Sequence, residues 1–128
     1  MQAWLRARIL AATGMSALVG PRVDWGAAKQ GDPMPRIEMH VISDPPDMNM
    51  AGPSGWSAAR VQADVRARSV TEAKAVADLI VPLFNGVRID TDALRTRSFV
   101  LDRSSSTESD KAGIIHRVQI DLQVWHTP

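Results

Sequence analysis

Histidine is the first residue type to consider, because a neutral imidazole is both a common metal ligand and a common general base. The chain has three histidines, His40, His116 and His126. His40 falls on the polar side of an alternating segment, His116 begins an apolar side, and His126 lies in the C-terminal tail. A metal ion needs three or four converging ligands, and no spacing of His, Asp and Glu here resembles a metal motif. We therefore expect no metal centre and no histidine-based catalysis.

The other candidate nucleophiles also lack the surroundings that would activate them. The string Gly52-Pro53-Ser54-Gly55 has neither the spacing nor the following helix of a nucleophile elbow. The absence of cysteine excludes disulfides, thiolate metal sites and cysteine nucleophiles. Asp90 and Asp92 are two residues apart, but the rest of a calcium-binding loop is missing. No glycine-rich phosphate loop occurs. The sequence therefore predicts a protein that is not an enzyme and that binds no cofactor.

A row of arginines is the best candidate for contact with nucleic acid. Arg60, Arg66 and Arg68 alternate along one segment, but Gln62 and Asp64 interrupt them. No aromatic residues lie between them to stack on bases. The formal net charge of the whole chain is only +1. A mixed-charge strand face therefore fits this row better than a dedicated DNA-binding surface.

The remaining candidates are residues that could contact another protein. Two predicted strands share a polar face of both signs, which suits either solvent or a polar subunit interface. Met48 and Met50 lie in a proline-rich connection, where adaptable methionines fit a binding surface but also a disordered hairpin tip. Trp56 and Trp125 lie at element ends, and each either plugs the core or anchors an interface. The candidate interface residues are Met48, Met50, Trp56, Arg60, Gln62, Asp64, Arg66, Arg117, Gln119 and Asp121.

Length and composition indicate one globular domain over residues 1–128. A chain of 128 residues has the usual size of one domain. Hydrophobic residues make up 45% and charged residues 23%, which argues against disorder. No run approaches the roughly 18 apolar residues of a membrane span. The apolar stretch over 9–19 contains Thr13, Gly14 and Ser16, so we expect no cleaved signal peptide.

The N-terminal half predicts a helix and then a strand. Apolar residues at helical spacing predict an amphipathic helix over 2–13, followed by a short helical turn ending at Val19. Residues 21–35 contain glycines and prolines, which predicts an ordered loop or a short extended piece. Apolar and polar residues alternate over 37–41, which predicts a half-buried strand. Residues 44–55 then read as a long loop at the protruding end of a hairpin.

The C-terminal half predicts a strand, a helix and two further strands. Residues 56–68 alternate small apolar with polar residues, and Ser69 with Glu72 forms the capping box of a helix that runs to Phe84. After it come a link over 87–94, a strand over 96–104, a polar and mobile turn over 104–112, and a strand over 114–125. This order, α-β-β-α-β-β, predicts an α+β fold: a small sandwich in which an antiparallel or mixed four-stranded sheet carries helices on one face.

The order and spacing of several short motifs resemble a known family. The resemblance is carried by Leu18-Val19-Gly20, Arg22-Val23-Asp24-Trp25-Gly26, Pro35-Arg36-Ile37, Gly55-Trp56, the strand Ala59-Arg60-Val61-Gln62-Ala63-Asp64-Val65, and the helix that holds Glu72 and Ala73-Lys74-Ala75-Val76-Ala77-Asp78. Over roughly residues 2–125 the chain resembles the tail-completion, or tail-terminator, proteins of long-tailed bacteriophages and gene transfer agents. The serine-rich turn at 104–110 and the methionine-containing loop at 46–53 match no feature of that family.

The resemblance implies a structural virion protein. Family members form a ring, usually of six subunits, at the head-proximal end of the tail tube. The ring stops polymerisation of the major tail tube protein and joins the head–tail connector or stopper protein. DNA would pass through such a ring with only non-specific contact. The chain would then be made in the cytoplasm of a bacterial host, become part of a virion or gene-transfer-agent tail, and have no membrane association.

Three other interpretations stay open at this point. A head–tail connector or stopper would share the polar surfaces but not the position in the tail. A nucleic-acid-contacting adaptor would use Arg60, Arg66 and Arg68, and its DNA retention would depend steeply on salt. A small α+β ligand-binding or enzymatic domain would need polar groups converging in a pocket, and the sequence offers none.

Overall fold

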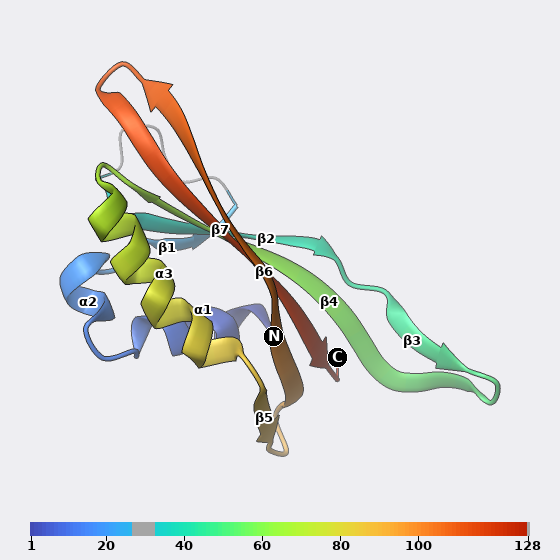
Figure 1. Ribbon diagram of the computed structural model, residues 1–128. Helices are drawn as coiled ribbons and strands as arrows, with labels where there is room; N and C mark the ends of the chain where they lie inside the picture. Colours follow the sequence, from blue (N-terminus) through green and yellow to red (C-terminus); the bar gives the residue numbers. More distant parts are fainter. Residues whose placement is uncertain (27–32, 128) are drawn as a thin grey trace.

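The computed structural model describes residues 1–26 and 33–127. In these residues the chain forms three helices, α1 (Gln2–Leu10), α2 (Met15–Leu18) and α3 (Val70–Phe84). The strands are β1 (Val23–Trp25), β2 (Arg36–Ser43), β3 (Pro46–Asn49), β4 (Gly52–Ala67), β5 (Val87–Asp90), β6 (Arg95–Asp110) and β7 (Gly113–His126) (Figure 1). The described residues contain no helix long and apolar enough to cross a membrane.

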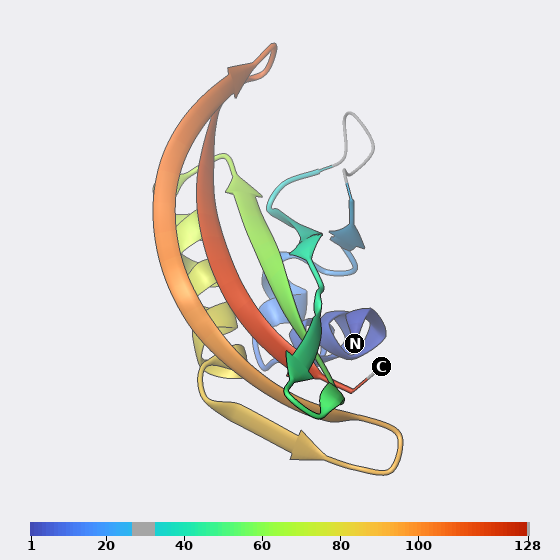
Figure 2. The same cartoon turned by 90° about the vertical axis from the view of Figure 1, so that its right-hand side faces the viewer.

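The strands form one mixed, strongly curled sheet of seven strands (Figure 2). The order across it is β1-β2-β4-β7-β6-β5, and β3 pairs with β4 on the side that β2 occupies. Only β1 and β2 run parallel, and the other pairs are antiparallel. The hairpins β3–β4 and β6–β7 project from the body of the protein in different directions (Figure 1).

The core lies between the helices, mainly α3, and the strands β2, β4 and β7. Alternation along β4 turns its small apolar residues toward α3, and Val61 pairs with Val41 on β2 and Leu122 on β7. Alanine at positions 59, 63 and 67 leaves room for the helix to approach closely. The large side chains without solvent exposure include Leu5, Ile9, Met15, Ile37, Ile80, Phe84 and Ile120.

The helix α3 begins and ends where local chemistry predicts. The Ser69 hydroxyl accepts a hydrogen bond from the Glu72 N–H at 3.1 Å, which satisfies one of the unpaired donors of the first turn. Buried apolar residues recur every three or four positions along α3 and form the face that packs on the sheet; they include Ala73, Val76 and Ile80. Pro82 lies within the last turn, and the helix ends at Phe84 with Asn85 as its C-cap.

The expected four-stranded α+β sandwich is wrong, because the sheet has seven strands and the protein is mainly β. Three strands were missed. Strands β1, β3 and β5 contain only three or four residues each, too few to show an alternating pattern. Of the two alternatives for residues 21–35, a loop or a short extended piece, the structure has an extended piece at Val23–Trp25, which pairs as β1 with β2. The part of this prediction that falls on residues 27–32 lies outside the described residues.

The polar turn expected over 104–112 is also wrong. Strand β6 continues to Asp110 and pairs with β7 as far as the register Asp110↔Gly113. The serines and threonine of this segment are exposed, so its polarity reflects a hairpin that stands away from the core. The backbone pairing with β7 makes it a strand despite the absence of an apolar face. The hairpin closes because Gly113 takes a positive φ of 129°.

Candidate assembly surfaces

The polar face is the side of β2, β4 and β7 that points away from α3, and it faces the viewer in Figure 2. Its residues are Arg36, Glu38 and His40 on β2, Arg60, Gln62, Asp64 and Arg66 on β4, and Arg117, Gln119, Asp121 and Gln123 on β7. The register aligns them in rows across the three strands, with Arg36, Arg66 and Arg117 in one row and Glu38, Asp64 and Gln119 in the next. A row of cations therefore lies beside a row that contains two carboxylates.

Ion pairs between these rows neutralise most of the charge. The Glu38 carboxylate lies 3.2 Å from Nε of Arg36 and 3.2 Å from Nε of Arg66. Arg66 also pairs with Glu108, which comes from β6. The Arg117 Nη2 donates to the Asp64 carboxylate at 2.9 Å. Like charges directly opposite one another destabilise a sheet, and the carboxylates of the neighbouring row offset that effect.

The strong burial of these charges distinguishes them from ordinary surface groups. The side chain of Asp64 is 5% exposed and that of Glu38 is 7% exposed, although none of the described helices covers this face. The outer pair, Arg60 with Asp121 at 3.6 Å, is looser because the Arg60 side chain is half exposed. Gln62 and Gln119 lie half-buried among the charged residues. The polar face is thus a packed, internally paired layer in which Arg60 keeps the most exposed charge of these pairs.

The β3–β4 hairpin carries exposed methionines at its end. Met48 is more than half exposed, and Met50 in the turn is fully exposed. The connection expected as an irregular loop is a pair of strands, with Pro46 opposite Ser57 and Met48 opposite Pro53. Its base is held by the Ala58 N–H, which donates to the Pro45 carbonyl at 3.0 Å. A paired hairpin presents its methionines in a more defined position than an irregular loop would.

Trp56 lies near the base of the same hairpin and contacts two arginines. The guanidinium carbons of Arg95 and Arg97 lie 5.1 and 5.4 Å from its ring centroid, which is cation–π geometry. Nearby, His126 lies 2.9 Å from the Asp44 carboxylate and ties the end of β7 to the β2–β3 corner. Trp56 is half-buried, so it acts at least in part as a brace between β4 and β6.

The arginines beside Trp56 are fixed in turn by a carboxylate on β5. Arg88 Nε donates to Asp90 at 2.8 Å and Arg97 Nη1 donates at 2.9 Å. These hydrogen bonds from Arg88 and Arg97 lower the pKa of Asp90 to about 2. The Arg68 guanidinium likewise forms a bidentate pair with Asp110 and lowers the pKa of that carboxyl. This second pair ties the end of β4 to the β6–β7 hairpin.

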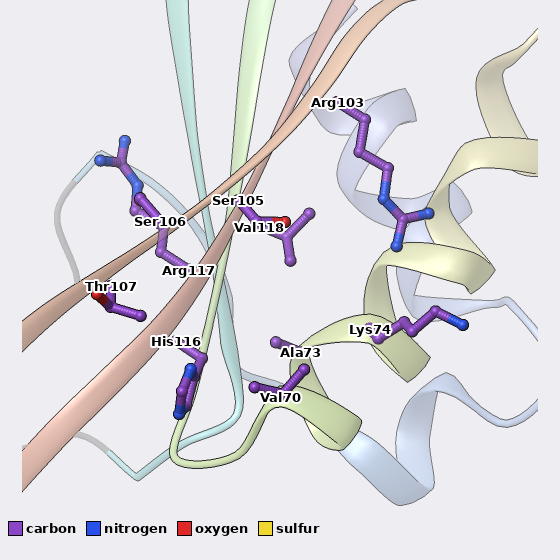
Figure 3. A pocket seen from close by; sticks show the side chains of 10 residues that line it. All are labelled: Val70, Ala73, Lys74, Arg103, Ser105, Ser106, Thr107, His116, Arg117 and Val118. Carbon is purple, nitrogen blue, oxygen red and sulfur yellow. The ribbon is translucent and has the colours of Figure 1, made fainter.

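A hollow of about 510 Å³ lies on the other side of the sheet, between the start of α3 and the β6–β7 hairpin (Figure 3). Val70, Ala73 and Val118 supply its apolar lining, and Lys74 and His116 lie at its edge. Arg103, also at the edge, is held by Asp78 at 2.8 Å. Among the described residues no hydrogen bond joins His116 to a hydroxyl, and no three His, Asp or Glu side chains gather to hold a metal ion.

Comparison with known proteins identifies the family. The family model described as "Tail completion protein gp17" matches residues 3–127, which is nearly the whole chain. The chain belongs to this family of tail completion proteins. It is thus a structural component of a phage-type tail.

A solved structure supports the fold of this tail completion protein. A chain in the structure titled "Virion of native gene transfer agent (GTA) particle" superimposes with a TM-score of 0.70. The superposition covers 100% of this chain and 95% of that chain, with 16% sequence identity. At this identity the likeness concerns the fold. No curated protein matches the sequence.

Some of these features follow from local sequence patterns, and others depend on contacts between distant strands. The alternation in β4 and β7 predicted the polar face correctly, because a strand's period of two places alternate residues on one face. It gave no indication that Glu38 and Glu108 bind Arg66, because those contacts depend on the register between strands. The arginines around Trp56 were also missed, since Arg95 and Arg97 lie about forty residues further along the chain. No local pattern marks such long-range pairs.

Proposed function

We propose that this tail completion protein forms a closed ring of six copies at the head-proximal end of the tail tube. The ring ends polymerisation of the major tail tube protein and provides the surface that joins the head–tail connector or stopper. The observation that carries this proposal is the family match over residues 3–127. The solved neighbour, whose title places it in a gene transfer agent virion, supports the same setting.

The shape of the molecule fits a ring subunit. A ring needs head-to-tail contacts in which two different surfaces of the subunit meet, and the curled sheet has dissimilar ends and two projecting hairpins (Figure 1). The proposed contact residues are Met48, Met50, Trp56, Arg60, Gln62, Asp64, Arg66, Arg117, Gln119 and Asp121. Among them the methionines are the most exposed, and the charged residues of β4 and β7 mainly organise the polar face.

The polar face fits a role beside passing DNA better than a role in holding it. Arg66 and Arg117 contact carboxylates within their own subunit. Releasing them for a phosphate would leave the largely buried Asp64 without its partner and would remove one of the two arginines that pair with Glu38. This observation argues against the nucleic-acid adaptor. A connector or stopper stays the alternative, since it would use the same surfaces at a different place in the particle. Synthesis in the cytoplasm of a bacterial host and a non-enzymatic role are part of the proposal.

Removing the gene from its phage or gene transfer agent tests the termination role. If the ring ends the tube, tails made without it vary in length, and none joins a head. A plasmid copy of the gene restores uniform tails joined to heads. Negative-stain measurement of tail lengths reads both effects. Tails of normal length that lack heads would support the connector role instead, and normal particles would contradict both roles.

A further inference from the structure

The exposed large apolar side chains of the described residues gather at particular places in the fold. They are Ile42, Met48, Met50, Val70, Phe99, Leu101 and Ile114. Ile42, Met48 and Met50 lie on the β2–β3 side of the sheet, whereas Phe99 and Leu101 lie on β6 at the opposite side. Val70 starts α3, and Ile114 lies near the turn of the β6–β7 hairpin. Exposed apolar groups concentrated in this way mark contact surfaces.

The outer edge of β6 is open over most of its length. Strand β5 pairs only with residues 95–98, so within the described chain no strand covers residues 99–110 from outside. One backbone group of this stretch is used, because the Val100 N–H contacts Asn85 Oδ1 at 3.4 Å. A bulge lies between Val100 and Asp102, and it leaves Leu101 outside the regular pairing with β7. An edge of this length with two exposed apolar side chains is a template for another strand.

The opposite edge offers a matching surface. Strand β1 pairs only with residues 37–39 of β2, so β2 beyond Met39 and all of β3 have no described strand on their outer side. Pro45 and Pro46 lack backbone N–H groups, which limits strand addition to the residues that follow them. Met48 therefore lies in the part of β3 that can both pair and contribute an apolar side chain.

We propose that neighbouring copies join edge to edge, with β3 of one copy lying along residues 99–104 of β6 in the next. Met48 and Met50 then contact Phe99 and Leu101 across the joint. This inference rests on the proposed ring and specifies its subunit contact. Because the two edges differ and lie on opposite sides of the sheet, the contact repeats head to tail, as a closed ring requires.

The charges of the two edges are complementary. Residues 41–59 contain Asp44 and Asp47 and no lysine or arginine. Residues 87–103 contain four arginines against three aspartates, and Arg88 and Arg95 are more than half exposed. Arg88, Arg95 and Arg97 share the single carboxylate of Asp90, so an excess of positive charge lies beside residues 99–104, which themselves hold one aspartate and one arginine. Opposite net charges beside the joint favour the correct orientation of two copies and disfavour contact between like edges.

Cysteine cross-linking in assembled tails tests this joint directly, because the natural chain has no cysteine. Tails are assembled from a mixture of two single variants, Met48→Cys and Leu101→Cys, and treated with a short bis-maleimide. We expect a covalent dimer that contains one copy of each variant. The matched control replaces Leu101→Cys by Ile114→Cys, which is exposed to a similar degree but lies outside the proposed joint. The control mixture should give no dimer.

The result separates this inference from the proposed function. Cross-linking in the control but not in the test mixture, in tails that carry a ring, overturns the edge-to-edge joint and leaves the ring intact. Absence of a ring in unmodified tails overturns the proposed function itself. As a second measurement, the double variant F99K and L101K should keep the thermal midpoint of the isolated protein while failing to occupy tails. Full occupancy by this variant would also overturn the joint.

Discussion

The charged residues of the polar face act as structural parts of the sheet. Glu38 contacts Arg36 and Arg66 while its own side chain is almost completely buried. A carboxylate in such a position must keep its cationic partners, because an unpaired buried charge is costly. The same reasoning applies to Asp64 beside Arg117. Arg66 and Arg117 therefore form their ion pairs within their own subunit.

Replacing Glu38→Gln should therefore lower the free energy of unfolding by about 1–2 kcal/mol, because the buried ion pairs with Arg36 and Arg66 are lost. Urea unfolding of the purified variant measures this. Asp121→Asn is the matched control, since Asp121 pairs with the half-exposed Arg60 and such pairs contribute less than about 1 kcal/mol. Equal effects of the two variants would contradict the distinction.

Asp90 makes an acid-dependent contribution to stability. Its folded pKa of about 2 lies below the ordinary value of 3.8, so its ion pairs stabilise the fold fully above the ordinary pKa and are lost as the pH falls toward 2. Asp90→Asn should make the unfolding free energy fall less steeply between these two pH values. Urea midpoints across that interval test this. Asp92→Asn, which changes a neighbouring carboxylate without a described ion pair, should leave the slope closer to that of the natural protein.

At the scale of elements, the cap of α3 is the most clearly local device. The Ser69 hydroxyl accepts from the Glu72 N–H, and Ser69→Ala should cost about 1 kcal/mol because that donor is left without its partner. Thermal or urea unfolding gives the value. Thr71→Ala is the control, because Thr71 is exposed and lies two residues after Ser69 in the first turn of the helix; it should lower the stability less. A loss no greater than that of the control would mean that water replaces the cap without cost.

The β3–β4 hairpin should affect assembly and leave folding nearly unchanged. Replacing Pro46–Met50 with a Gly-Ser linker of equal length removes Met48 and Met50, which lie outside the core. We expect the thermal midpoint of the isolated protein to change little, while tails fail to join heads. Differential scanning calorimetry and counts of joined particles provide the two readouts. Normal joining, or unfolding of the isolated variant, would contradict this role.

The contrast between α3 and the short strands explains how far the sequence could be interpreted. A fifteen-residue helix with a capping serine and a periodic apolar face can be predicted from its own residues. The long strands β4 and β7 do so as well through their alternation. Strands β1 and β5 exist because a neighbour offers backbone partners, which no local pattern records. The polar segment 104–110 was misjudged for the same reason, since pairing with β7 outweighs its composition.

The polar face could likewise be predicted only in part. The alternation of polar and apolar residues predicts which residues lie on this face, among them Asp64 and Arg117. It does not predict which of them pair with one another. The pairing of Arg66 with both Glu38 and Glu108 brings together β2, β4 and β6, whose register is set by the whole sheet. Whether the predicted interface residues contact other subunits stays a prediction, and cross-linking from Met48→Cys tests one of them.

For the whole molecule, the paired charges predict weak contact with DNA. We expect the purified protein to retain little double-stranded DNA at about 0.15 M salt, because Arg66 and Arg117 are occupied by carboxylates. Filter binding across a salt series measures this, with Asp64→Asn as a variant that frees Arg117 and should raise retention. Strong retention by the natural protein that falls steeply with salt would favour the nucleic-acid adaptor.

The central claim is that this protein forms the ring at the head-proximal end of the tail. Electron cryomicroscopy of intact particles tests it most directly, because the curled seven-stranded sheet with its two long hairpins is a recognisable shape to place in density. We expect six copies in one closed ring between the last tube layer and the head connector. Density for this chain within the head, along the tube, at the distal tip, or as a single copy at the junction would contradict it.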